Sequence, residues 1–185
     1  MVTDSRTRLV EAAQQLFAQQ GVSATSPRDV LAASGVGQGS LYHHFPTKHD
    51  LALAAVAATA AETLEAARGR LQGDAAPLDR VVAYLERPRD ALGGCRVGRL
   101  TADQAVVDDD GLRAEVAGYF TGLIDEVAAV LRETGLDADA ALDRARACVA
   151  IIQGGYVLAR ATQDPELLRS AVRGFVALLT GPATA

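Results

Sequence analysis

The sequence predicts an all-α fold with about nine helices. Apolar residues recur three and four positions apart along most of the chain, and no stretch shows the two-residue alternation of a strand. Aromatic residues make up only 4%, Trp is absent and alanine is abundant, which suits closely packed helices better than a β-sandwich. With 185 residues, 49% of them hydrophobic, the chain can bury a sizeable core in one large domain or two small ones.

The first predicted helix ends at Gly21, which serves as a C-terminal glycine. Its apolar stripe consists of Leu9, Ala12, Ala13, Leu16 and Phe17. These positions are separated by three, four, seven and eight residues from the first, so they share one face of an amphipathic helix.

Two short helices are predicted next, over residues 27–34 and 38–45. Ser26 is a favoured N-cap, and Pro27 stands at the first helical position, where proline is preferred. Pro46 ends the second helix. The turn between them is three residues long and contains two glycines, which predicts a helix-turn-helix.

The rest of the chain is predicted to form longer helices separated by polar and glycine-containing segments. These helices cover residues 48–71, 78–86, 112–133, 137–163 and a last stretch from 165 to about 181. Thr47 and Asp137 are suitable N-caps for two of them. Residues 91–101 hold three glycines, so we expect a loop or a broken helix there.

The second short helix has one apolar and one polar face. Leu41 and Phe45 are four positions apart and are expected to pack inward. The outward positions carry Gln38, Ser40, Tyr42, His43 and His44, all able to reach base edges or phosphates. Gly39 lets the backbone approach DNA closely. The second helix of a helix-turn-helix enters the major groove, so the pattern indicates DNA binding, although Tyr42 could also be a core aromatic.

The segment TSPRDVLAASGVGQGSLYHHFPTKHDL, from Thr25 to Leu51, resembles the DNA-binding signature of the TetR family of bacterial transcriptional regulators. The resemblance covers roughly residues 6–55, and the layout of the later helices is also similar. It implies a helix-turn-helix DNA-binding domain in residues 1–50 and a helical ligand-binding and dimerisation domain in residues 51–185.

The resemblance also implies which residues contact DNA: Ser26, Arg28, Gln38, Gly39, Ser40, Tyr42, His43, His44, Thr47 and Lys48. Gln38 and Ser40 are expected to read bases, because glutamine pairs bidentately with adenine. Tyr42, His43, Thr47 and Lys48 are expected to hold the phosphate backbone. Gly37 departs from the capping Ser or Thr that the family often has, and Gln38 replaces a frequent Lys or Arg.

A regulator of this family is expected to be a homodimer, because two recognition helices must reach successive major grooves about 34–36 Å apart. The apolar stripes of the last two helices predict the interface, formed by Val149, Ile152, Tyr156, Leu168, Val172, Phe175 and Leu179. Paired with their symmetry mates, these helices would form a four-helix bundle. A helix buried within one chain gives the same stripe, so that alternative stays open.

A ligand pocket is implied in the C-terminal helices, and its expected lining is mainly apolar. The candidates are Leu85, Cys95, Leu100, Tyr119, Phe120, Leu123, Ile124, Ile151 and Tyr156. The segment around Cys95 resembles one found in family members that sense electrophiles or oxidants. Arg96 and Arg99 could favour its thiolate, whereas the simpler interpretation is a small buried residue in a tight turn.

No metal site, cofactor or enzymatic activity is expected. Cys95 and Cys148 are far apart and form no Cys-x-x-Cys pair, which predicts neither a zinc site nor a disulfide framework. His43 and His44 point about 100° apart on a helix, and no third ligand is in register. No nucleophile–base–acid set and no phosphate-binding glycine loop is evident.

The formal net charge of −5 excludes indiscriminate coating of nucleic acid. Residues 1–50 hold four basic and four acidic residues, so the acidity belongs to the remainder. With neither a secretion signal nor an apolar span of about 20 residues, a cytoplasmic protein without membrane contact is expected. The sequence therefore predicts a repressor that binds a palindromic operator as a homodimer and is released by a small lipophilic or electrophilic effector. The alternatives are an activator of the same family and a helical small-molecule carrier that does not bind DNA.

Overall fold

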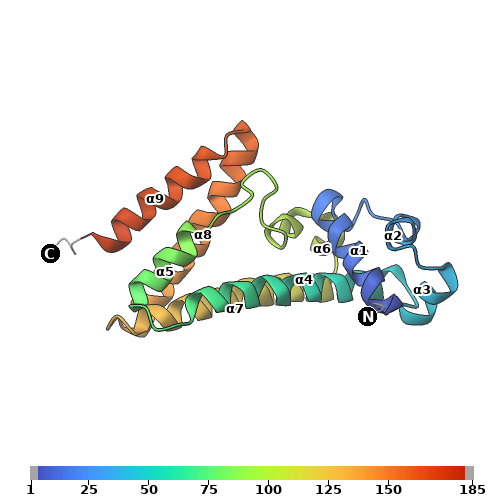
Figure 1. The fold of residues 1–185 in the computed structure, drawn as a ribbon, viewed down its shortest axis with the longest axis horizontal. Helices are drawn as coiled ribbons and strands as arrows, with labels where there is room; N and C mark the ends of the chain where they lie inside the picture. Colours follow the sequence, from blue (N-terminus) through green and yellow to red (C-terminus); the bar gives the residue numbers. More distant parts are fainter. Residues whose placement is uncertain (1–3, 182–185) are drawn as a thin grey trace. The chain divides into compact units, whose positions relative to one another are not determined.

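The computed structural model describes residues 4–181, and over that range it contains nine α-helices, one 3₁₀ helix and no strand (Figure 1). The elements are α1 (Ser5–Gln20), α2 (Pro27–Ser34), α3 (Gln38–His44), α4 (Lys48–Leu71), α5 (Pro77–Glu86), η1 (Gly98–Ala102), α6 (Gln104–Val107), α7 (Asp110–Arg132), α8 (Ala138–Thr162) and α9 (Glu166–Thr180). The predicted all-α class is confirmed.

Side-chain caps set the start of several helices where the sequence predicts them. The hydroxyl of Ser26 accepts the backbone N–H of Asp29 at 3.2 Å, and the Asp29 carboxylate accepts the N–H of Ser26 at 2.8 Å. Thr47 and Asp50 form the same reciprocal pair at the start of α4, with distances of 3.1 and 2.9 Å. Asp137 accepts the N–H of Ala140 at 2.8 Å and begins α8. Each cap satisfies helical donors that have no partner within the helix.

The segment from 91 to 107 contains structure that the sequence does not predict. Residues 91–97 are turns, η1 follows, and Asp103 caps the four-residue helix α6 by accepting the N–H of Ala105 at 3.0 Å. A single turn of helix is too short to show a period of 3.6 residues, so its pattern is invisible in the sequence.

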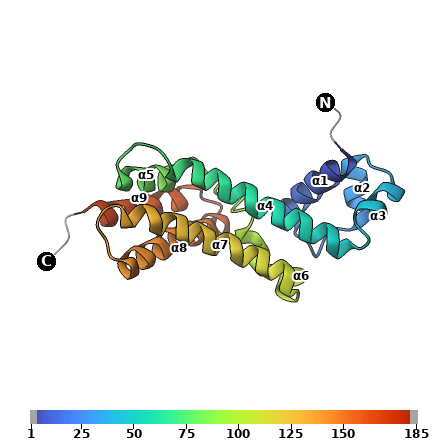
Figure 2. The same cartoon turned by 90° about the horizontal axis from the view of Figure 1, so that it is seen from below.

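The chain forms two compact units, of which the first comprises residues 4–63 and 96–119. Within it, α1 packs on both α2 and α3, and the three helices gather in one cluster in both views (Figures 1 and 2). Its core includes Leu9, Phe17, Val30, Leu41, Phe45 and Val56, all at most 5% exposed. Burial of these side chains fixes how the two short helices sit on α1.

The second unit comprises residues 64–95 and 120–181. In it, α9 packs against both α8 and α5 (Figure 2). The close approach of α8 and α9 requires Gly155, because an added Cβ would lie 2.5 Å from a methyl carbon of Leu168. Arg68 on α4 donates to Glu126 on α7 at 2.7 Å and pairs these two helices. Among residues 4–181, none of the helices combines the length and apolar character that crossing a bilayer demands.

Candidate nucleic-acid interface

The turn between α2 and α3 is held by one glycine and one arginine. Gly35 follows α2 with a φ of 64°, in the left-handed region that favours glycine, and its N–H bonds to the carbonyl of Leu31 at 3.0 Å. Arg8, on α1, donates to the carbonyl oxygen of Ser34 at 2.5 Å. Val36 is buried within the turn. The turn that sets α3 relative to α2 is therefore stabilised by residues of α1 and of the turn itself.

The two faces of α3 differ as the sequence predicts. Leu41 and Phe45 are 2% and 4% exposed, which confirms that they pack inward. The guanidinium of Arg6 lies 5.4 Å from the centroid of the Phe45 ring and covers it from α1. On the other face Tyr42 is 48% exposed, so it is a surface residue rather than a core aromatic.

Most of the predicted DNA contacts are exposed in this unit. The exposed residues are Arg28, Gln38, Gly39, Tyr42, His43, Thr47 and Lys48, and the half-buried ones are Ser26, Ser40 and His44. Gln38, Gly39 and Ser40 form the first turn of α3. In a helix-turn-helix, this end of the second helix is the part that contacts base edges. A Cβ added to Gly39 would meet no atom within 4 Å, so this side of the helix is open to a close neighbour.

Tyr42, Thr47 and Lys48 come together at the junction of α3 and α4, where they line one small hollow with Pro27. The Thr47 hydroxyl donates to Asp50 at 2.7 Å and so belongs to the cap of α4. Lys48 is the first residue of that helix. An ammonium group beside a helix N-terminus is a suitable environment for a phosphate.

Ser26 and Asp29 have a structural role in addition to any contact with DNA. The Ser26 hydroxyl donates to the Asp29 carboxylate at 2.7 Å. That hydrogen bond, followed by the backbone one from Ser26, lowers the pKa of Asp29. Ser26 therefore fixes the start of α2, and while its hydroxyl donates to Asp29 it has no second proton to donate to a phosphate oxygen.

The rings of His43 and His44 lie edge to face, with their centroids 5.1 Å apart. Within the described range of 4–181, no three His, Cys, Asp or Glu side chains cluster as metal ligands would. His49, at the start of α4, pairs with Asp109 at 3.0 Å. The pKa of Asp109 is lowered, first by the N–H of Leu112 and then by His49.

Asp103 ties the segment after Gly98 to the helix-turn-helix, a contact that the sequence does not reveal. Its carboxylate accepts the N–H of Val22 at 2.7 Å and the hydroxyl of Ser23 at 2.6 Å. Burial alone would raise the pKa of Asp103, but the hydrogen bonds from Ser23 and from nearby backbone N–H groups outweigh it and lower the pKa. The turn after α1 is thus held by an acidic side chain from about eighty residues away.

Arg99 holds the other side of the same connection. Its guanidinium donates to the carbonyl of Ala18 at 2.5 Å and to that of Gln19 at 3.1 Å. These carbonyls belong to the last turn of α1, where a cation is stabilised by the helix dipole. Together, Asp103 and Arg99 form what we call the 99/103 anchor. Only the folded chain brings these residues to α1.

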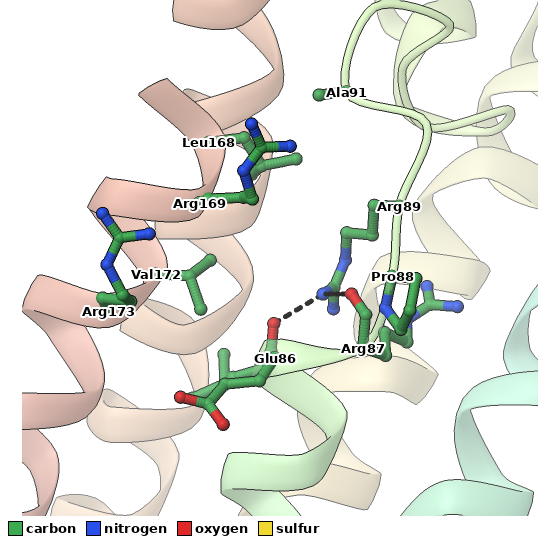
Figure 3. Close-up of a pocket in the computed structure, with 10 residues that line it drawn as sticks. Glu86, Arg87, Pro88, Arg89, Ala91, Leu168, Arg169, Val172 and Arg173 are labelled. Carbon is green, nitrogen blue, oxygen red and sulfur yellow. Dashed lines mark hydrogen bonds between the residues drawn. The ribbon is translucent and has the colours of Figure 1, made fainter. Parts of the chain in front are cut away.

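The larger pocket lies in the second unit, between α9 and the segment that follows α5 (Figure 3). Of the residues predicted to line a ligand pocket, Leu85 belongs to its lining, and the other eight do not. Cys95, Leu100, Tyr119, Leu123 and Tyr156 are buried, whereas Phe120, Ile124 and Ile151 are half-buried. The pocket is also more basic than predicted, because four arginines line it, Arg87, Arg89, Arg169 and Arg173.

The residues predicted for the dimer interface contribute to the packing of the chain itself. Val149, Ile152, Tyr156, Leu168 and Val172 are at most 9% exposed within one chain, and Phe175 and Leu179 are half-buried. Other apolar side chains of α8 and α9 reach the surface, namely Val157 at 67%, Leu158 at 51% and Leu178 at 83% exposure.

The two cysteines are both buried. Burial raises the pKa of the Cys148 thiol to about 12. The arginines near Cys95 in sequence make other contacts, since Arg96 pairs with Glu62 at 3.6 Å and Arg99 belongs to the 99/103 anchor. Cys95 is buried, as the simpler interpretation expects.

Comparison with known proteins covers both parts of the chain. Residues 9–55 match the model of the bacterial regulatory proteins of the tetR family. Residues 75–173 match the model of the C-terminal domain of LmrA/YxaF-like transcriptional regulators. The first match contains the whole of α2 and α3, and the second contains α5 to α8.

Individual proteins are similar over most of their length. The HTH-type transcriptional regulator LmrA of Bacillus subtilis is 30% identical, with 84% of this chain and 86% of that protein covered. An uncharacterised HTH-type transcriptional regulator encoded in the lacX 3′ region of Lactococcus lactis is 28% identical, with 90% and 89% covered. The crystal structure of reduced E. coli NemR has a TM-score of 0.82 at 23% identity, covering 93% of this chain and 95% of that one, and shows the same fold.

Proposed function

Because the chain belongs to the TetR family of helix-turn-helix transcriptional regulators, we propose that it is a repressor that binds a palindromic operator as a homodimer and leaves it when a small effector binds. The relatives are named as transcriptional regulators, so a regulatory rather than an enzymatic role is part of this proposal. In it, residues 1–50 bind DNA and residues 51–185 bind the effector and the second subunit.

The observation that carries the proposal is the two-faced helix α3. Leu41 and Phe45 anchor one face in the core, while Gln38 and Tyr42 are exposed on the other. The N-terminal turn of α3 is the part that a helix-turn-helix presents to base edges, so Gln38 and Ser40 are proposed to read the operator sequence. Tyr42, His43 and Lys48 are proposed to hold phosphates, which fixes the register of the helix on the duplex.

The second subunit is proposed to cover the exposed apolar residues of α8 and α9. Val157, Leu158 and Leu178 are all more than half exposed in one chain. Pairing α8 and α9 with their symmetry mates would bury these side chains and give the dimer two copies of α3, one for each half-site. Most of the residues that the sequence pattern predicts for the interface are also packed within one chain, so the proposal rests on the exposed side chains beside them.

Effector release is proposed to be a shift between two populations of the dimer. A ligand that binds more tightly to the form with the wrong spacing between recognition helices lowers the fraction able to bind DNA. For a tenfold loss of operator affinity, the effector must bind the form that cannot bind DNA more tightly than the other form, by a free energy of about 1.4 kcal/mol.

The test is retention of a labelled DNA fragment from upstream of the chain's own gene, in the presence of excess nonspecific DNA. We expect a complex at nanomolar protein, as for specific regulators. Gln38→Ala and Tyr42→Ala should each weaken it by at least tenfold, because each removes a proposed contact worth about 1–3 kcal/mol. Gln72→Ala is the matched control, since Gln72 is exposed but lies after α4 in the second unit.

Failure to retain any fragment from the gene or its neighbour would favour the carrier alternative. Equal affinities for the wild type and the two α3 variants would refute the assignment of α3 as the recognition helix. Deletion of the gene in its host should raise transcription from the bound promoter, whereas a fall would identify an activator.

A further inference from the structure

The pocket beside α9 combines an apolar floor with an excess of positive charge. Its volume is about 390 Å³, within the size range of small-molecule sites. The apolar part of the lining consists of Leu85, Pro88, Ala91, Leu168 and Val172. Figure 3 shows Leu168 and Val172 on α9 directed toward the segment with Pro88 and Arg89, with Arg169 and Arg173 on the same helix. Four arginines and a single carboxylate, Glu86, line the pocket in a chain whose net charge is −5.

The arginines of α9 are only partly neutralised. Arg169 donates to Glu166 at 2.7 Å, and Arg173 donates to the same carboxylate at 2.6 Å. One negative charge is therefore shared by two guanidinium groups, both about 60% exposed. Arg169 and Arg173 can therefore attract a bound anion with their excess positive charge while both stay hydrogen-bonded to Glu166.

The arginines that follow α5 interact with neutral groups. Arg89 donates to the carbonyl oxygens of Leu85 and Tyr84 at 2.5 and 2.7 Å. The guanidinium groups of Arg87 and Arg89 lie 5.5 and 5.4 Å from the centroid of the Tyr84 ring. The Nε atom of Arg87 is buried without a hydrogen-bond partner, and so is that of Arg89. Buried donors of this kind lose hydration without a replacement.

Like charge and burial act together on Arg89. Burial lowers its pKa first, and the neighbouring charge of Arg87 lowers it further. An anion bound near these two side chains would reduce their mutual repulsion. A neutral lipophilic ligand would cover the apolar floor but would not reduce the repulsion between Arg87 and Arg89.

We propose that this pocket binds an organic anion that has one acidic head group and an apolar body, with the head group at the arginines and the body on Leu85, Leu168 and Val172. The role of such a ligand as the effector rests on the proposed function, which it makes more specific. A lone inorganic anion would leave the apolar floor uncovered, so the combination of charge and floor favours an aromatic or aliphatic carboxylate.

Isothermal titration calorimetry with matched pairs of probes tests the proposal. The pairs are 2-naphthoate with 2-naphthamide and octanoate with octanamide, which differ in charge while keeping the apolar body. We expect at least one carboxylate to bind at least ten times more tightly than its amide, and its affinity to fall as salt rises. Equal affinities within both pairs, or no binding by any probe, would overturn the proposal.

Variants then locate the site. The double variant Arg169→Gln/Arg173→Gln should weaken carboxylate binding by at least tenfold and leave amide binding unchanged. Glutamine has nearly the helix propensity of arginine, so α9 should be preserved, as circular dichroism can verify. The control is Arg144→Gln/Arg146→Gln, which removes the same charge from exposed positions of α8 that do not line the pocket. An equal loss in the control would refute the assignment.

Mobility shift with the bound carboxylate separates this inference from the proposed function. If the carboxylate binds and also dissociates the operator complex, both stand. If the carboxylate binds as predicted but the protein retains no specific DNA, the anion site stands and the regulatory proposal fails. If DNA is retained and no carboxylate binds, the regulatory proposal stands and the inference of an anion site fails.

Discussion

Gly39, in the first turn of α3, is the residue whose lack of a side chain is proposed to let DNA approach the backbone closely. An added Cβ would meet no atom of the chain within 4 Å, so the fold does not require glycine at this position. A helix interior is in fact destabilised by glycine relative to alanine. Close approach of DNA to the first turn of α3 is the role proposed for this glycine.

Gly39→Ala should therefore separate stability from binding. We expect the free energy of unfolding to rise by about 0.5–1 kcal/mol, and operator affinity to fall at least tenfold as the methyl group meets the groove. Urea unfolding and mobility shift measure the two effects. The control is Gly69→Ala, at an exposed and equally open position of α4. Gly69→Ala should raise the free energy of unfolding and leave operator affinity unchanged. An unchanged operator affinity in Gly39→Ala would contradict the proposed close approach of DNA.

Among the elements, η1 and α6 are short but bring the 99/103 anchor to α1. Asp103 binds the turn that leads into α2, and Arg99 binds the last turn of α1. The helices of the DNA-binding part thus depend on residues outside residues 1–50. From three glycines the sequence predicts a loop or broken helix over residues 91–101, and it predicts neither η1 nor α6, because each is too short to show periodicity.

Asp103→Asn should destabilise the protein in a pH-dependent manner. The pKa of Asp103 is lowered in the folded state, so its contribution is present above the pKa of the unfolded chain, near 3.8, and is lost as pH falls below it. At pH 7 we expect a loss of about 1–2 kcal/mol in the free energy of unfolding, from weakened charge-assisted hydrogen bonds. By pH 3 the difference from wild type should be clearly smaller.

Urea unfolding at the two pH values provides the measurement, with Asp74→Asn in an exposed loop as control. The free energy of unfolding of the Asp74→Asn control should match that of the wild type at both pH values. A difference for Asp103→Asn that persists or grows toward pH 3 would show that its carboxylate charge is not what stabilises the turn after α1.

For the whole molecule, the proposed dimer depends on apolar surface that one chain leaves exposed. Leu178 on α9 and Val157 on α8 are 83% and 67% exposed. Exposed apolar side chains gathered on neighbouring helices commonly mark a protein interface. A dimer of this kind also doubles the DNA contacts, which compensates for a chain that is acidic overall.

Val157→Glu/Leu178→Glu should convert a dimer to a monomer, because charges would be buried without partners at the interface. Sedimentation velocity measures the change in mass, and operator affinity should fall by at least a hundredfold when only one half-site is bound. The control is Val107→Glu, which places one such charge at a 43% exposed position in the first unit. If Val157→Glu/Leu178→Glu stays dimeric, the interface lies elsewhere on the chain.

The sequence by itself determined the all-α class, the capped starts of the helices, the helix-turn-helix and the inward packing of Leu41 and Phe45. These features depend on contacts between residues a few positions apart, which spacing and caps reveal directly. Only the tertiary structure decided which apolar stripes are internal, that Asp103 and Arg99 reach α1, and that four arginines line the pocket beside α9. Each of these depends on packing between segments distant in the chain, and an apolar stripe looks the same whether its partner is its own chain or a second one.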